Sequence, residues 1–330
     1  MRRPNWSTRG LAMRIKMSRQ NTLFFLVEGR THDRSFYDRV IRNAPAMKDW
    51  RHDIRLVGDE AVGESVSSDA GGKQVAYALF TYYEEEGLLV RKSNAALSGV
   101  VFVLDRDFDH LSGMLIESPH ILYTRHADVE AEVLGNGSLI EAVGAAYSLD
   151  VGTIESILGD LVNPSKCLAA IWKEWLILLH VVQKFQIYCG FHLHQGSTIN
   201  DSDSAAKYGP VNHSQLESLR ARVVAGLEEM GHVDCTAILE ASAQEVEELI
   251  RAGREIEFLK GKWIQSFLSY WIKKHEKAYN FRGSVQQQTI VSCCMLTLDF
   301  DLPWAEHYND RISRAIKACE LQGDSFAETV

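Results

Sequence analysis

The sequence lacks any apolar run that approaches the roughly 20 residues needed to cross a bilayer. The longest candidate, WLILLHVV beginning at Trp175, is short and carries a histidine. Residues 1–20 contain six basic side chains and no acid, but neither the apolar stretch nor the cleavage site of a secretory signal. We therefore expect a cytoplasmic protein with no membrane contact. The basic segment itself has two explanations, an arm that touches phosphates or a poorly ordered leader.

Cysteine pairs with metal-binding or redox spacing are also missing. The six cysteines show no CxxC pattern, and Cys293 and Cys294 are adjacent within an apolar run, so we expect reduced thiols in the core. The Walker pattern GxxxxGK[ST] does not occur, and Gly71-Gly72-Lys73 is only a fragment of it. The chain should therefore not hydrolyse ATP itself. A formal charge of −9 argues against coating nucleic acid by bulk electrostatics, but it is compatible with a local acidic metal site.

What the sequence does contain is an alternation of buried strands and helices over its first 150 residues or so. Continuous apolar runs predict strands, which we place at residues 23–27, 54–57, 99–104 and 120–123. A helix should follow the first strand, with Thr31 as its N-cap. The pattern predicts an α/β fold with a parallel sheet and right-handed crossovers. From about residue 149 helical periodicity takes over, so we divide the chain into a basic segment (1–20), an α/β domain (21–148) and a helical region (149–330) that serves docking or dimerisation.

Acidic side chains follow three of the predicted strands. Glu28 comes after the first, Asp105 and Asp107 after the third, and Asp128 and Glu130 after the fourth. Because parallel strands end at the same edge of a sheet, we expect these groups to share one site. Packing carboxylates together raises their pKa unless a cation neutralises them. Oxygen ligands without His or Cys favour Mg²⁺ or Mn²⁺ over zinc, and several carboxylates suit two ions.

These segments also resemble a known family. The runs LFFLVEGRTHDRSFY and VVFVLDRDFD resemble the Glu-Gly and DxD motifs of TOPRIM domains, and ILYTRHADVEAEVL is similar to the following element in TOPRIM-like nucleases that accompany ABC-type ATPases in anti-phage defence. The resemblance covers about residues 23–134. It implies a TOPRIM-like sheet flanked by helices, with Glu28 near the reacting phosphate or on a metal. It also implies that Asp105, Asp107 and Glu130 are metal ligands, with Asp128 beside them.

A later segment, EFLKGKWIQSFLSYWIKK, is similar to a Gly-Lys element of the same family. The resemblance implies that Lys262 reaches the scissile phosphate, although a solvated helix start explains this lysine equally well. The family also implies a toxic effector that cleaves tRNA, is held inactive by an ABC-type ATPase subunit and forms a homodimer when active. Two alternatives stay open: a DNA nuclease or nickase with the same site, and a catalytically inactive partner of the ATPase.

Two further signals have a structural and a functional reading. His192 and His194 alternate as metal ligands on a strand could, but no third ligand accompanies them. Tryptophans at helical spacing amid Leu and Ile could stack on bases, but packing in the core is the commoner role. We therefore expect packing for the four tryptophans of this kind, Trp172, Trp175, Trp263 and Trp271.

Overall fold

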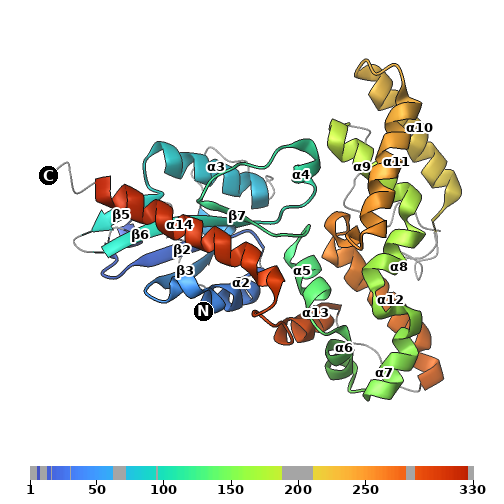
Figure 1. The fold of residues 1–330 in the computed structure, drawn as a ribbon, viewed down its shortest axis with the longest axis horizontal. Helices are drawn as coiled ribbons and strands as arrows, with labels where there is room; N and C mark the ends of the chain where they lie inside the picture. The colour runs from blue at the N-terminus through green and yellow to red at the C-terminus, as the bar shows by residue number, and fades with distance from the viewer. Residues whose placement is uncertain are drawn as a thin grey trace. The chain divides into compact units, whose positions relative to one another are not determined.

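The structure is a computed structural model. It describes residues 6–7, 13–15, 17–29, 31–61, 72–93, 96–187, 211–279 and 287–325. The chain forms two compact units (Figure 1). We call Met1–Asp105, Ile116–Thr124 and Asp299–Val330 the sheet unit, and Arg106–Leu115 and Arg125–Leu298 the helical unit. These units do not coincide with the ranges 21–148 and 149–330 drawn from the sequence, because residues 106–115 and 125–148 belong to the helical unit and residues 299–330 to the sheet unit.

The sheet unit is built on a mixed, mostly parallel five-stranded sheet. Its strands are β2 (Thr22–Val27), β3 (Arg51–Leu56), β5 (Val90–Ser93), β6 (Ala96–Leu104) and β7 (Ile121–Tyr123). Strand β2 lies between β3 and β6, and these pairs and the pair β6–β7 are parallel. The parallel arrangement of the four predicted strands is thus confirmed. Strand β5, which pairs antiparallel with β6, was not predicted, because the sequence VRKS has little apolar character. A separate parallel pair joins β1 (Trp6–Ser7) and β4 (Glu60–Ala61).

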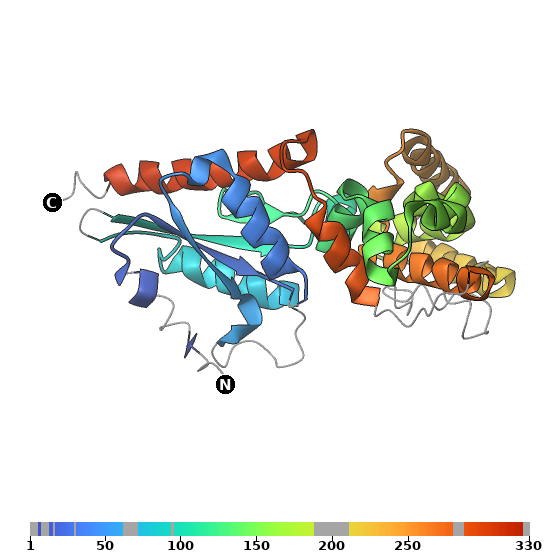
Figure 2. The same ribbon diagram turned by 90° about the horizontal axis from the view of Figure 1, so that it is seen from below.

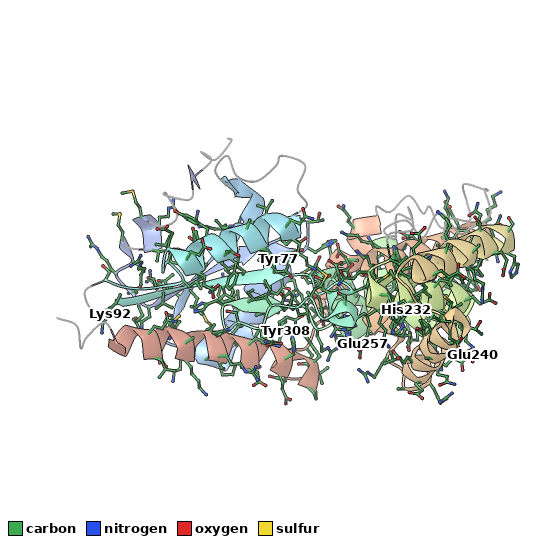
Figure 3. All side chains as sticks on the ribbon, turned by 90° about the horizontal axis from the view of Figure 1, so that it is seen from above. Tyr77, Lys92, His232, Glu240, Glu257 and Tyr308 are labelled. Carbon is green, nitrogen blue, oxygen red and sulfur yellow. The ribbon has the colours of Figure 1, made fainter. Side chains whose placement is uncertain are left out.

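Helices cover both faces of this sheet, with α2 (Asp33–Asn43) and α14 (Glu306–Ser325) on one face and α3 (Gly72–Glu85) on the other (Figure 2). The ring of Phe36 on α2 contacts Tyr308 on α14, and Phe80 on α3 contacts Phe102 on β6. Figure 3 labels Tyr77 and Tyr308 on the two helical layers. Because both faces are covered, every residue of β2 is buried, which explains its unbroken apolar run.

The helical unit contains the remaining helices of the described chain. They are α4 (Asp109–Ser112), α5 (Val129–Asn136), α6 (Leu139–Tyr147), α7 (Val151–Leu158), α8 (Pro164–Ile171), α9 (Lys173–Phe185), α10 (His213–Glu229), α11 (Cys235–Arg251), α12 (Gly261–Tyr279) and α13 (Gln287–Leu296). Single 3-10 turns occur at Pro45–Met47, Val57–Asp59, Gly159–Val162, Glu255–Phe258 and Pro303–Ala305. Several helices begin at Asp, Asn or Ser side chains that accept a backbone N–H, as N-caps do.

Tryptophan packing forms the centre of the helical unit. Trp172, Trp175 and Trp263 are buried, and their rings meet edge to face with centroids 5.0 to 5.8 Å apart. Such contacts stabilise a core beyond the area they bury. Trp271 is partly exposed, and its Nε1 donates to the carbonyl of Ile157 at 2.8 Å. The predicted packing role is thus confirmed for Trp172, Trp175 and Trp263, whereas Trp271 packs only in part.

Other sequence-based expectations meet the structure only in part. His192 and His194 lie outside the described residues, as does most of the basic segment 1–20. None of the helices within the described ranges combines the length and the apolar character of a membrane span. Thr31 does not cap α2, since His32 occupies the N-cap position and no side chain bonds there.

Candidate active site

Glu28 and Asp105 leave neighbouring strands at the same edge of the sheet unit. Val27 at the end of β2 is in register with Val103 of β6, and the Glu28 N–H donates to the Val103 carbonyl at 3.2 Å. Asp105 follows the last residue of β6 directly. Parallel strands thus deliver these two carboxylates to the edge at which open α/β sheets bind ligands.

The turn after Glu28 is held by an aspartate that the sequence analysis overlooked. Asp33, in the first turn of α2, is buried and accepts a hydrogen bond from the Gly29 N–H at 2.8 Å. A side chain at residue 29 would collide with this carboxylate, so glycine is required there. On the other side, Gly72 begins α3 so close to Glu28 that a Cβ would lie 2.9 Å from the glutamate Cγ. Both contacts restrict where the Glu28 carboxylate can go.

Asp107 belongs to the helical unit and has an unusual backbone. Its φ of 49° lies in the left-handed region, which few residues other than Gly, Asn and Asp adopt. The conformation is fixed by a hydrogen bond from the Asp107 N–H to the Ala127 carbonyl at 2.8 Å. The carboxylate accepts from the ammonium of Lys260, with Nζ 3.0 Å from Oδ1. A cationic group therefore already contacts this predicted metal ligand.

Asp128 connects two helices of the same unit. Its Oδ1 accepts from the Ala131 N–H at 2.8 Å, which caps α5, and from the Gly261 N–H at 2.9 Å, which begins α12. At residue 261 a Cβ would meet the backbone of Glu130 and Ala131, so only glycine allows the two helices to approach this closely. Lys260 and Gly261 thus bond Asp107 and Asp128, respectively.

The surroundings of Asp128 are buried and acidic. Asp128 and Glu130 are both largely buried, at 2% and 8% exposure. Burial, followed by the negative charge of Glu130, raises the pKa of Asp128 to about 7, whereas the two bonded N–H groups and the charge of Lys262 act in the opposite direction. Two carboxylates that repel each other away from water form an oxygen-only donor set, which is the type that Mg²⁺ and Mn²⁺ prefer.

Of the two lysines that flank Gly261, Lys260 contacts the Asp107 carboxylate. Its side chain is 14% exposed, and the ammonium also lies 5.7 Å from the ring of Phe108. Lys262 is exposed in the first turn of α12 and acts on Asp128 through its charge. The signal for Lys260 was present in the sequence as the other lysine of Lys-Gly-Lys, but spacing alone does not show which side chain turns inward.

The predicted site residues therefore fall into two sets. Glu28 and Asp105 belong to the sheet unit, and Asp107, Asp128, Glu130 and Lys262 belong to the helical unit. Within the described part of the chain, no three His, Cys, Asp or Glu side chains form a group that could hold a metal ion. Convergence of the two sets on one ion stays a prediction.

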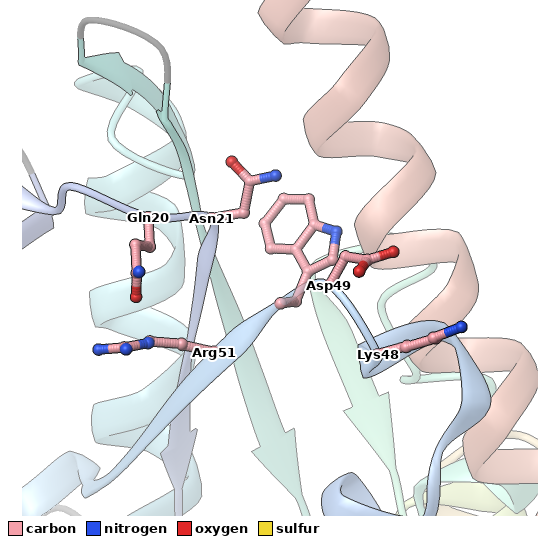
Figure 4. Close-up of a pocket in the computed structure, with 6 residues that line it drawn as sticks. Gln20, Asn21, Lys48, Asp49 and Arg51 are labelled. Atoms are coloured by element: carbon pink, nitrogen blue, oxygen red, sulfur yellow. The ribbon is translucent and has the colours of Figure 1, made fainter.

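A pocket of about 430 Å³ in the sheet unit lies away from these carboxylates (Figure 4). Its lining residues, Gln20, Asn21, Lys48, Asp49, Trp50 and Arg51, precede or begin strands β2 and β3. Glu28 and Asp105 follow the strands instead. The pocket is thus at the opposite edge of the sheet and has no part in the candidate site.

The fold and the comparisons define the class of the protein only broadly. The sheet unit has an α/β fold with a mixed, mostly parallel sheet and helices on both faces. No protein-family model matches the chain, and no curated protein matches it. The function of the protein is therefore inferred from its residues and motifs.

Proposed function

We propose that this protein is a TOPRIM-type, metal-dependent endoribonuclease that cleaves tRNA. The observation that carries the proposal is the exit of Glu28 and Asp105 from neighbouring parallel strands at one sheet edge. Ligands of open α/β sheets bind at that edge. The motifs at these strand ends are Glu-Gly after β2 and Asp-Arg-Asp after β6. These are the motifs that resemble TOPRIM domains.

Under this proposal the acidic residues and the lysines have different roles. Glu28, Asp105, Asp107 and Glu130, with Asp128 beside them, would hold one or two Mg²⁺ or Mn²⁺ ions. Such ions lower the pKa of a water and stabilise the charge that develops on a phosphate. Asp128 positions the start of α12 through its bond to the Gly261 amide and caps α5 through its bond to the Ala131 amide. Lys260 and Lys262 place positive charge where a scissile phosphate would gain negative charge.

The biological role in this proposal follows from the motif resemblance. Among TOPRIM-like nucleases that accompany ABC-type ATPases, the chain most resembles AriB, the effector of the PARIS anti-phage system. The protein would then be a toxic effector of abortive infection, held inactive by an AriA-like ATPase partner and active as a homodimer after release. The absence of a Walker motif in the sequence is consistent with ATP hydrolysis by a separate subunit.

The proposal is tested by cleavage assays with labelled tRNA and with plasmid DNA. We expect tRNA cleavage in Mg²⁺ or Mn²⁺ and none in EDTA. Glu28→Gln should lower the rate on the order of 10²- to 10⁴-fold, the usual contribution of a group that moves a proton or sits on the reacting phosphate. Glu229→Gln, at an exposed position on α10, is the matched control and should leave the rate unchanged.

Each other result has a definite meaning. Cleavage that survives EDTA contradicts the metal-dependent mechanism. Cleavage of plasmid but not tRNA favours the DNA nuclease. Absence of any cleavage at saturating Mn²⁺, with the protein folded, favours a catalytically inactive partner of the ATPase.

A further inference from the structure

Helix α12 differs in charge from the acidic molecule that contains it. Over its 19 residues it has four lysines and one glutamate, whereas the whole chain has a net charge of −9. Helix α11, by contrast, has four glutamates and one arginine. A local excess of lysine in an acidic protein marks a surface where anion binding is concentrated.

Three of these lysines, Lys273, Lys274 and Lys277, lie in the second half of α12 and are exposed. At 3.6 residues per turn they span an arc of roughly 100° on the helix. Lys273 and Lys277 are separated by about one turn, or ~6 Å along the axis. We call these three residues the lysine stripe. The exposed Lys262 in the first turn lies close to the same side of the helix.

Packing on the other side of α12 keeps the lysine stripe facing solvent. Ile272 is fully buried, and Trp271 is anchored by its hydrogen bond to Ile157 of α7. The glutamate of the helix, Glu276, is half-buried, and burial together with the charge of Glu276 raises the pKa of Tyr147 on α6. Among the residues of α12, the stripe therefore gathers three of the four lysines on one exposed side.

An aromatic row lies on the side of α12 away from the stripe, since Trp271, His275 and Tyr279 are roughly 160 to 240° around the helix from Lys273. Their ring centroids are 5.4 and 6.4 Å apart, and the Lys274 ammonium lies 5.6 Å from the centroid of the Trp271 ring at the border of the two sides. The stripe itself is formed by lysines, the side chains that contact phosphates on surfaces that hold nucleic-acid backbones.

We infer that the lysine stripe of α12 binds the phosphate backbone of an RNA substrate along this helix, whose first residue, Gly261, donates its N–H to Asp128. This inference rests on the proposed function for the identity of the substrate. The stripe contacts phosphates and so contributes affinity without sequence preference. The choice of tRNA and of the cut position belongs to other parts of the molecule.

Binding is measured apart from catalysis. The Glu28→Gln protein in EDTA is titrated with fluorescent tRNA over a series of salt concentrations, and compared with the same protein carrying Lys273→Gln, Lys274→Gln and Lys277→Gln. Each lysine on a phosphate contributes about 0.7 to 0.9 to the slope of log K against log salt. We expect the triple substitution to lower that slope by about 2 to 3 and to weaken binding at low salt about tenfold or more.

The control carries three lysines of equal exposure elsewhere, changed as Lys48→Gln, Lys166→Gln and Lys317→Gln. It should keep the affinity and slope of the parent protein. Equal losses in both triple variants, an unchanged slope in the stripe variant, or no RNA binding by the parent would overturn the inference. So would binding of the stripe to anionic lipid vesicles but not to RNA. If the stripe variant loses RNA binding while the unsubstituted protein cleaves nothing, the stripe stands and the nuclease proposal fails.

Discussion

At the scale of single residues, the candidate site depends on the sequence Lys-Gly-Lys at the start of α12. Gly261 has no side chain to separate α12 from α5, its N–H binds Asp128, and the residue before it forms an ion pair with Asp107. An ammonium that neutralises a buried or half-buried carboxylate acts more strongly than one in bulk water, because the local dielectric is lower. Under the proposed function, we therefore expect Lys260 to contribute more to catalysis than the exposed Lys262.

This comparison of the two lysines is a direct test. Under the proposed function, Lys260→Gln should lower kcat/KM for tRNA on the order of 10²-fold, as removal of one preorganised charge does. Lys262→Gln should cost less, because that side chain is exposed. Lys260→Arg should restore part of the activity, since it keeps the charge. A larger loss of kcat/KM in Lys262→Gln than in Lys260→Gln would assign the catalytic role to Lys262 instead.

At the scale of elements, the contact between α5 and α12 determines where Asp128 and Glu130 lie relative to the lysines. The helices approach so closely that even one methyl group at residue 261 would meet the backbone of Glu130. Cores and helix junctions resist added volume because they are packed at crystal-like density. The position of Asp128 and Glu130 therefore depends on the absence of a side chain at residue 261 as much as on charge.

Substitution of that glycine tests the condition. Gly261→Ala should lower the free energy of unfolding by about 1 to 3 kcal/mol, the usual cost of overpacking, measured by urea denaturation. The matched control is Gly152→Ala in α7, an exposed position where the nearest atom to a Cβ is a carboxylate oxygen at 3.4 Å. There the stability should be unchanged or slightly raised, because alanine favours helix. An equal change in the free energy of unfolding in the two variants would mean that α5 and α12 accommodate the added methyl group without cost.

At the scale of the whole molecule, buried histidines couple stability to pH in both units. Burial lowers the pKa of His110 to about 4 and also lowers the pKa values of His120 and His180. These rings therefore take up protons at lower pH in the folded protein than in the unfolded chain, where histidine titrates near pH ~6.5. Because the unfolded state then binds more protons, stability falls as pH drops below that value and continues to fall towards the folded pKa.

His120 allows this effect to be isolated in the sheet unit. Its Nδ1 lies 2.8 Å from the Val100 carbonyl, so this nitrogen donates and Nε2 is left to carry any added proton. His120→Asn keeps a donor but cannot titrate. The free energy of unfolding, measured at several pH values between 7.5 and 5, should fall less steeply in His120→Asn, by up to ~1.4 kcal/mol per pH unit. An exposed histidine replaced in the same way, His213→Asn, should leave the slope as it is.

Much of this architecture was determined by the sequence itself. Apolar runs identified β2, β6 and β7, since strands buried on both faces are largely apolar. Strand β3 was predicted from residues 54–57 alone and is only partly buried. Parallel pairing of those strands then placed Glu28 and Asp105 at one edge. These features are local, because the apolar pattern that predicts a buried strand lies within a short stretch of neighbouring residues.

Other features were decided only by tertiary structure. The return of α14 to the sheet and the contact of Lys260 with Asp107 join segments that are far apart in the chain, and no local pattern encodes such contacts. Residues 260 and 107, for example, are distant in the chain yet form an ion pair. The physical reason is that burial of an apolar face, or neutralisation of a carboxylate, can be satisfied by many partners, and only the packing of the whole chain selects one.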